Sequence, residues 1–189
     1  MKQAIILAIT ASFGISAFAA PETYVVDPLH TFPSFSYMHH GFSTQQSKFD
    51  KTSGKIIIDR AAKTGSLDII IDVTSVNTGS ELFTEHIKGE NLLNVERFPA
   101  ITFKSNTFQF DGDRVGAIVG DLTIKGVTKM VTLMVTSFNC GTHANTKKSI
   151  CGANAHTRIK RSEFNAGRSV PNVGYEVTLN IVVEAFQEK

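Results

Sequence analysis

Apolar and polar residues alternate along much of the chain, which is the pattern of a β-strand with one buried face. The alternation is clearest over residues 67–73, 127–136 and 176–184, where odd-numbered positions are apolar with few exceptions. Turn signals such as Asp111-Gly112 separate neighbouring runs, and Asp-Gly favours a tight hairpin. Further strands are expected at residues 30–40, 43–49, 55–59, 101–110, 114–125 and 152–162.

Residues 80–95 break the alternation and predict a short helix. Apolar side chains recur there at helical spacing, Ser80 is placed to cap the first turn, and Gly89 is placed to end the helix. Phe98-Pro99 then restarts an extended chain. No linker, repeat or low-complexity segment divides the rest of the sequence, so we expect one domain over residues 20–189.

The number and length of the strands indicate an all-β fold. About eight antiparallel strands at hairpin spacing are typical of a closed barrel or a sandwich. Several runs exceed ten residues, which favours an extended eight-stranded up-and-down barrel of lipocalin-like architecture, with the short helix near residues 80–95. Closure also removes exposed strand edges. Such a barrel can hold one small ligand, and a barrel filled by its own side chains is the alternative.

The first nineteen residues predict a secretory signal peptide. Met1-Lys2 is a short positive start, Ala4 to Phe13 is almost wholly apolar, and Ala17-Phe18-Ala19 is a small-x-small cleavage site. We therefore expect cleavage after about Ala19 and export of residues 20–189 to the periplasm. A retained N-terminal anchor is the alternative.

Composition narrows the classes of function. The 189 residues carry a formal net charge of +2, and 42% of them are hydrophobic while 19% are charged. Disordered chains have a lower apolar content than this sequence, so we expect a folded protein. A dedicated nucleic-acid-binding protein is expected to carry a basic stripe, so no nucleic-acid partner is predicted.

The two cysteines, Cys140 and Cys151, predict a disulfide that joins the ends of a long hairpin loop, residues 141–150. An oxidising compartment outside the cytoplasm favours such a bond. A redox-active pair is the alternative, although redox motifs favour a C-x-x-C spacing beside a helix start.

No catalytic or metal-binding motif stands out among the six histidines or elsewhere. His39 and His40 are adjacent, so on a strand they are expected to face opposite sides and not to share an ion. We therefore predict no metal, no cofactor and no enzyme activity. If the protein were an enzyme, Asp27 with His30, or His86 with Glu90, would be the acid–base candidates.

Several motifs, in their order along the chain, carry a family resemblance. The sequence resembles the YceI-like family of exported, lipocalin-like, polyisoprenoid-binding proteins. Where that family commonly has Arg-Asp before the helical histidine, this chain has Phe83 and Thr84, so a contact made by that pair in relatives cannot be carried over. The matching segments are Asp27-Pro28-x-His30-Thr31, Phe98-Pro99-Ala100-Ile101-Thr102-Phe103, residues 120–129 (GDLTIKGVTK) and Val173-Gly174-x-Glu176-Val177.

The resemblance implies a barrel tunnel that holds a long apolar chain, such as a polyisoprenoid or an isoprenoid quinone, for carriage through the periplasm. A homodimer is compatible with the resemblance, and a transient membrane contact is compatible with lipid transfer. The alternatives are a stress-related interaction protein with a filled barrel and an enzyme of lipid head groups. His30 and Arg161 are the candidates for polar head contacts. From the expected strand phase, the tunnel lining is predicted to include Phe35, Tyr37, His39, Phe49, Ile69, Ile71, Phe83, Leu92, Phe103, Leu133 and Val135.

Overall fold

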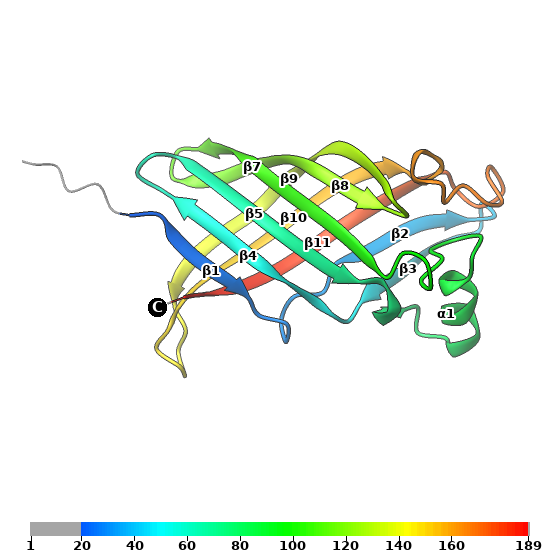
Figure 1. Cartoon of the computed structure of the whole chain (residues 1–189), viewed down its shortest axis with the longest axis horizontal. Helices are drawn as coiled ribbons and strands as arrows, with labels where there is room; N and C mark the ends of the chain where they lie inside the picture. The colour runs from blue at the N-terminus through cyan, green and yellow to red at the C-terminus, as the bar shows by residue number, and fades with distance from the viewer. Residues whose placement is uncertain (1–19, 189) are drawn as a thin grey trace, which may run out of the picture.

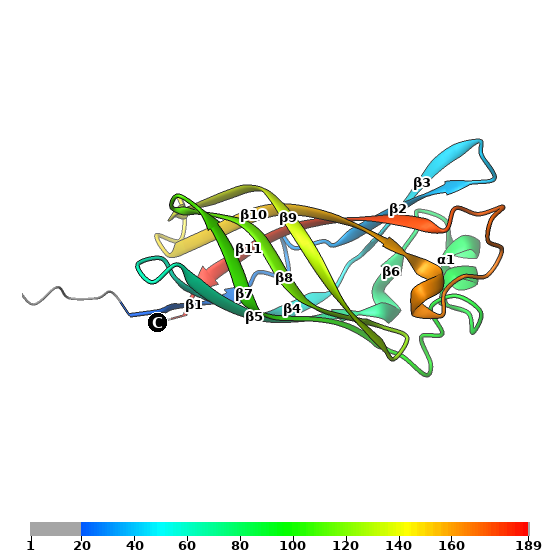
Figure 2. The same cartoon turned by 90° about the horizontal axis from the view of Figure 1, so that it is seen from above.

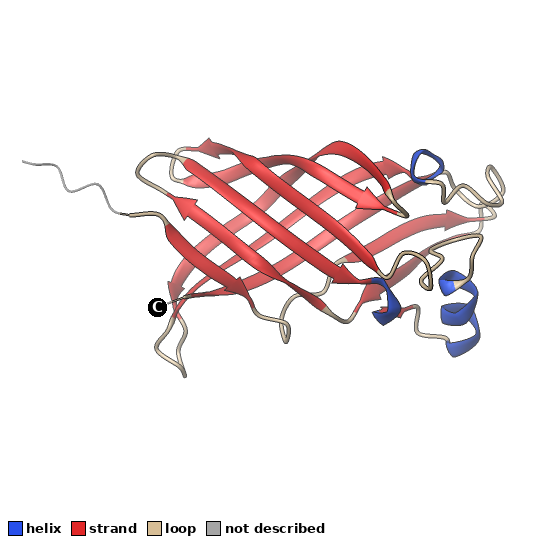
Figure 3. Ribbon diagram, in the orientation of Figure 1, coloured by secondary structure: helices blue, strands red, loops and turns tan. Residues whose placement is uncertain are grey.

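Antiparallel strands wind into an elongated barrel, with one helix near one end (Figures 1 and 3). The structure is a computed structural model that describes residues 20–188, so the predicted signal peptide lies outside the described residues. The strands are β1 (Glu22–Val26), β2 (Ser34–His39), β3 (Ser43–Phe49), β4 (Thr52–Asp59), β5 (Thr64–Asp72), β6 (Val76–Asn77), β7 (Ala100–Asp111), β8 (Arg114–Ile124), β9 (Val127–Thr142), β10 (Ser149–Lys160) and β11 (Glu176–Gln187). The helix α1 spans Glu81–Lys88, and short 3₁₀ turns cover Val73–Ser75 and Arg161–Phe164.

The barrel closes because β11 pairs with β1, which completes a ring in the order β1-β4-β5-β7-β8-β9-β10-β11. The other strands continue members of this ring. The end of β11 at Ala185 pairs with β1, while its start at Leu179 pairs with β2, so β1 and β2 form one interrupted strand. Likewise β3 continues β4, and β6 continues β5. Spatial order therefore follows chain order, and the predicted eight-stranded up-and-down barrel is confirmed.

Several element boundaries differ from those expected. The strand β1 was not predicted, because its five residues are too few to show a clear alternation. The run expected at residues 30–40 is shorter, since Asp27 to Pro33 form a loop before β2. The run expected at residues 152–162 ends at Lys160, where the 3₁₀ turn begins. The helix agrees with its prediction, with Ser80 accepting a hydrogen bond from the Phe83 N–H and Gly89 at the C-cap.

The two ends of the barrel are built differently. At the end that carries the loop between β9 and β10, Tyr24 is 0% exposed and packs with Cys151 and Ala185. At the other end, the β2–β3 hairpin stands apart from α1, and the segment between β10 and β11 lies beside them (Figure 2). None of the helices within residues 20–188 has the length and apolar character needed to cross a bilayer.

Candidate functional site

The barrel contains two adjoining cavities. The cavity at the α1 end, here called the mouth cavity, has a volume of about 270 Å³, and the inner cavity has a volume of about 150 Å³. Because they have lining residues in common, the two cavities adjoin, and together they are called the hollow. The shared residues are Phe35, Phe49, Ile101, Ile124 and Leu179.

Strand alternation makes the inner cavity apolar. Ile69 and Ile71 of β5 point inward, while Ile70 between them is 46% exposed on the outer wall. Phe103 of β7 and Leu133 of β9 line the cavity in the same way. Carbon surrounds this space on nearly all sides, so an apolar chain would exchange water for apolar contacts over its whole length there.

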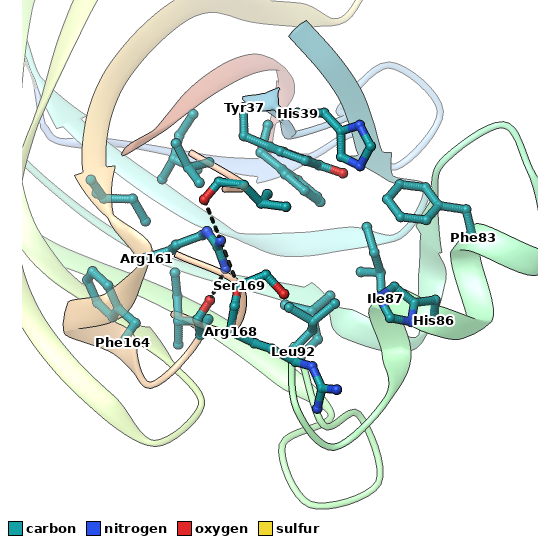
Figure 4. Close-up of a pocket in the computed structure, with 18 of the residues that line it drawn as sticks. Tyr37, His39, Phe83, His86, Ile87, Leu92, Arg161, Phe164, Arg168 and Ser169 are labelled. Atoms are coloured by element: carbon teal, nitrogen blue, oxygen red, sulfur yellow. Dashed lines mark hydrogen bonds between the residues drawn. The ribbon is translucent and has the colours of Figure 1, made fainter. Parts of the chain in front are cut away.

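The mouth cavity is assembled from separate elements (Figure 4). Tyr37 and His39 reach it from β2, while Phe83 and His86 reach it from α1, where their rings stack with centroids 6.1 Å apart. The segment from Arg161 to Val173 supplies the remaining side. This cavity therefore combines an apolar interior with polar groups.

Arg161 organises the segment on that side. Its guanidinium donates hydrogen bonds to four backbone carbonyls, so most of its donors are occupied within the chain. Burial lowers the pKa of Arg161, and the nearby Tyr37 hydroxyl opposes this effect only weakly. The four accepting carbonyls belong to Ala166, Arg168 (2.9 Å), Val173 (3.0 Å) and Gly174 (2.8 Å).

The positions of His39 and His40 correct one expectation from the sequence. The two rings were expected on opposite faces of a strand, but β2 ends at His39, and His40 has a left-handed backbone with φ of 50°. Both rings therefore line the mouth cavity, edge to face with centroids 4.4 Å apart. The backbone N–H of His40 donates a hydrogen bond to the Asn172 carbonyl at 3.0 Å. This bond holds the segment from Arg161 to Val173 against the end of β2.

The eleven residues predicted for the tunnel all line one cavity or the other, and Arg161 lines the mouth cavity. Their role in binding stays a prediction. His30 is not among the described residues that line either cavity, because its Nδ1 lies 2.7 Å from Asp27 Oδ2 on the outside of the barrel. Sequence reasoning did not single out His40, His86, Phe164, Ser169 and Leu179 as lining residues. Of these, Leu179 alone had a usable signal, the inward phase of its strand.

The predicted disulfide is present between Cys140 and Cys151. Its surroundings differ from those expected, because β9 and β10 run past the cysteines to Thr142 and Ser149. The bond therefore joins directly opposed residues within the ladder, with Cα atoms 4.1 Å apart, rather than the ends of an open loop.

Comparison with known proteins agrees with this architecture. The family model described as the YceI-like domain matches residues 24–185. The chain belongs to the YceI-like family. Protein YceI of Escherichia coli O157:H7 is 32% identical over 175 residues, which cover 92% of this chain and 91% of that relative.

Solved structures related to the family share the barrel. The crystal structure of Burkholderia cenocepacia BcnA matches with a TM-score of 0.72 at 25% identity, covering 84% of this chain and 98% of that one. A domain from Saccharophagus degradans, described as polyisoprenoid-binding and implicated in plant cell wall breakdown, matches with a TM-score of 0.64. It is 17% identical, and the match covers 87% of this chain and 98% of that one, so this likeness concerns the fold.

Proposed function

We propose that the protein is a periplasmic carrier that holds one long apolar chain, a polyisoprenoid or the tail of an isoprenoid quinone, in the barrel. The observation that carries this proposal is the largely apolar hollow made of the adjoining inner and mouth cavities. The polyisoprenoid-binding description of the Saccharophagus degradans domain supports the same class of ligand. The signal-peptide pattern of residues 1–19 supports export.

Tail burial alone provides enough free energy for such a role. Each buried methylene group contributes about 0.8 kcal/mol, so a chain of several isoprene units gains many kcal/mol on leaving water. Part of that gain offsets the entropy lost on binding. A carrier of this kind needs no charged contact to retain its tail.

Binding is favoured over catalysis by the positions of the acid–base candidates. Asp27 and His30 lie outside both cavities, and Glu90 is not among the described residues that line them although His86 is. Neither candidate pair therefore meets in the hollow. A bound tail would reach the mouth without meeting a carboxylate placed for proton transfer.

A charge placed in the inner cavity should abolish retention of the lipid. Ile71 is 8% exposed and faces the cavity, whereas its neighbour Ile70 is 46% exposed on the outer wall. We expect Ile71→Asp to lose its bound lipid, because a carboxylate cannot be desolvated against an apolar tail. Ile70→Asp, which adds the same charge one residue away, should keep the lipid. Native mass spectrometry of protein purified from the periplasm, followed by organic extraction, measures both.

A second variant guards against loss of folding in Ile71→Asp. Leu179 lines both cavities, so Leu179→Trp narrows the hollow where they meet without adding a charge. Circular dichroism checks that each variant keeps its strand content. If folded Ile71→Asp and Leu179→Trp both carry lipid at the wild-type level, the hollow is not the binding site and the proposal fails.

A further inference from the structure

Residues 80–97, here called the lid segment, form one wall of the mouth cavity. The segment consists of α1 and the turns that follow it, and Phe83, Ile87 and Leu92 line the cavity from it (Figure 4). The segment from Arg161 to Val173 supplies another wall. A tail that enters at this end therefore passes between two walls that are not part of the strand ladder.

The lid segment satisfies its backbone groups largely within itself. The Leu93 N–H, for example, donates to the Ile87 carbonyl at 3.1 Å. At its two ends the segment forms hydrogen bonds with its flanking residues, Thr78 and Phe98. Residues 80–97 are all described by the structure, and none of them belongs to a strand. The barrel ladder therefore does not hold this segment in place.

Beyond those flanking residues, one hydrogen bond joins the lid segment to the rest of residues 20–188. The Lys125 ammonium, in the turn between β8 and β9, donates to the Glu90 carbonyl at 3.2 Å. The same ammonium donates to the Asn165 carbonyl at 2.9 Å. None of the ion pairs found in this part of the chain includes Lys125. Its charged head therefore serves to connect the lid segment with the facing wall.

The remaining contacts between the lid segment and the barrel are apolar. Ile87 is 6% exposed and packs in the main core, and Phe83 and Leu92 pack against that core. Apolar contacts are not directional, so an entering tail replaces them without leaving a polar group unpaired. The two bonds of Lys125 are directional and charge-assisted, and a tail offers nothing in their place.

Both ends of the lid segment are suited to act as hinges. Gly79 precedes it with φ of 79°, and a Cβ at this position would meet no atom within 4 Å. At the other end, the Pro99 carbonyl accepts a hydrogen bond from the Val73 N–H at 2.9 Å, which fixes the chain to the barrel just beyond the segment. Hinges are a few residues at the ends of elements that absorb backbone changes.

We propose that residues 80–97 are a lid that opens to exchange the tail, and that Lys125 is its latch. The inference rests on the proposed function for what is exchanged, whereas the motion itself is measurable without a ligand. When both Lys125 bonds break, the lid segment turns about its ends and the apolar interior opens at the mouth. Lys125 is a positioning residue, because it is not among the described residues that line either cavity.

The exchange rate of a bound tail tests the latch. Delipidated protein is loaded with deuterated geranylgeraniol and chased with the unlabelled alcohol, and native mass spectrometry follows the replacement. Lys125→Met keeps the apolar stem and removes both bonds. A hydrogen bond from a charged group corresponds to about a tenfold or larger change in an equilibrium. We therefore expect Lys125→Met to exchange at least about tenfold faster than the wild type.

Three further variants control this result. Lys125→Arg should restore most of the slow exchange, because a guanidinium has enough donors for both carbonyls. Lys129→Met removes an equal charge from an exposed position on β9 and should leave the rate unchanged. Lys125→Gln is too short to bridge both carbonyls and should also exchange faster, which provides a second test if Lys125→Met folds poorly. Circular dichroism checks the strand content of each variant.

Affinity separates a latch from damage to the cavity. The latch is present with and without the tail, so its loss speeds entry and exit alike. The equilibrium affinity of Lys125→Met for geranylgeraniol should therefore stay close to the wild-type value. A cavity that had lost its shape would instead release the tail faster and bind it more weakly.

The motion of the lid is measured in the delipidated protein. Spin labels attached at Leu82→Cys, on the lid segment, and at Met130→Cys, on β9, occupy positions that are 84% and 74% exposed. Double electron–electron resonance should give a narrow distance distribution with Lys125 present. The same doubly labelled protein carrying Lys125→Met should give a broader one.

An unchanged exchange rate or an unchanged distance distribution in folded Lys125→Met would overturn the inference. Faster exchange with an equally large loss of affinity, or equal acceleration by Lys129→Met, would also overturn it. If the wild type does not bind geranylgeraniol at all, the carrier role for this class of tail fails. The distance distributions then still decide whether Lys125 latches the lid.

Discussion

Asp27 and His30 form an ion pair within the loop that follows β1, on the outside of the barrel. The His30 Nδ1–H donates to Asp27 at 2.7 Å, and Glu184 of β11 lies 4.0 Å from the same nitrogen. The hydrogen bond to Asp27 raises the pKa of His30 above 6.5. Burial alone would raise the pKa of Asp27, but hydrogen bonds from His30 and the Leu29 N–H outweigh it and lower that pKa below 3.8.

These shifts predict that the pair stabilises the fold only over a window of pH. The raised pKa of His30 means that its contribution is fully present below pH 6.5 and is lost as the pH rises through the raised value. The lowered pKa of Asp27 means that its contribution is present above pH 3.8 and is lost as the pH falls through the lowered value. His30→Ala should therefore lower the melting temperature at about pH 5 and change it little at about pH 9. Thermal unfolding followed by circular dichroism measures this, with His156→Ala on the exposed face of β10 as the control. An equal loss at both pH values would show that the His30 charge is not involved.

Single residues also show where sequence reasoning about the site succeeds. The inward phase of Ile69 and Ile71 follows from alternation, which depends only on neighbours along one strand. The adjacency of the His39 and His40 rings depends on a left-handed backbone at His40, a non-glycine residue that gives no clear local signal for it. The four hydrogen bonds from the Arg161 guanidinium to backbone carbonyls depend on the fold of the segment up to Gly174. The sequence therefore did not predict those side-chain positions that depend on backbone geometry or on contacts with distant segments.

At the scale of elements, the Cys140–Cys151 bond joins β9 to β10 at the end of the barrel that carries the loop between them. Replacing both cysteines with alanine should lower the free energy of unfolding by about 2–4 kcal/mol, because the bond restricts the unfolded chain. Urea unfolding of the wild type and the double variant measures the difference. Wild-type protein kept in reductant should match the double variant, and a double variant as stable as the oxidised wild type would contradict the prediction.

The long strands made the barrel predictable from the sequence, whereas the positions at which strands are interrupted were not predictable. Long strands such as β9 and β11 carry enough alternating positions to fix their phase and their antiparallel order. The breaks between β1 and β2 and between β3 and β4 fall where loops pack against other strands, as when the Phe49 N–H donates to the Pro33 carbonyl at 2.9 Å. Pro33 and Thr52, which lie at these breaks, line the inner cavity. The breaks arise from contacts between segments rather than from local propensity.

At the scale of the whole molecule, the hollow opens where exposed apolar side chains project. Phe42, in the turn between β2 and β3, is 91% exposed, and Leu82 of α1 is 84% exposed. Both elements lie at the end of the barrel that carries the mouth cavity (Figure 2). A protein that takes a lipid from a bilayer must bring its opening to that bilayer, and aromatic and leucine side chains are suited to enter the head-group region. We therefore expect the mouth end to make the transient membrane contact.

The absence of tryptophan from the sequence allows this contact to be measured residue by residue. Phe42→Trp and Leu82→Trp each create a single tryptophan at the mouth, and Leu29→Trp creates one at a position that is 74% exposed in the loop between β1 and β2. With vesicles of phosphatidylethanolamine and phosphatidylglycerol, the emission of the two mouth variants should shift to shorter wavelength, and brominated lipids should quench it. Leu29→Trp should keep the emission of a water-exposed indole, because its loop lies along the barrel away from the mouth (Figure 1).

If all three variants respond equally to the vesicles, the protein adsorbs without a preferred orientation. If none responds, lipid exchange proceeds without the mouth entering the membrane, since a docked mouth necessarily moves Phe42 and Leu82 out of water.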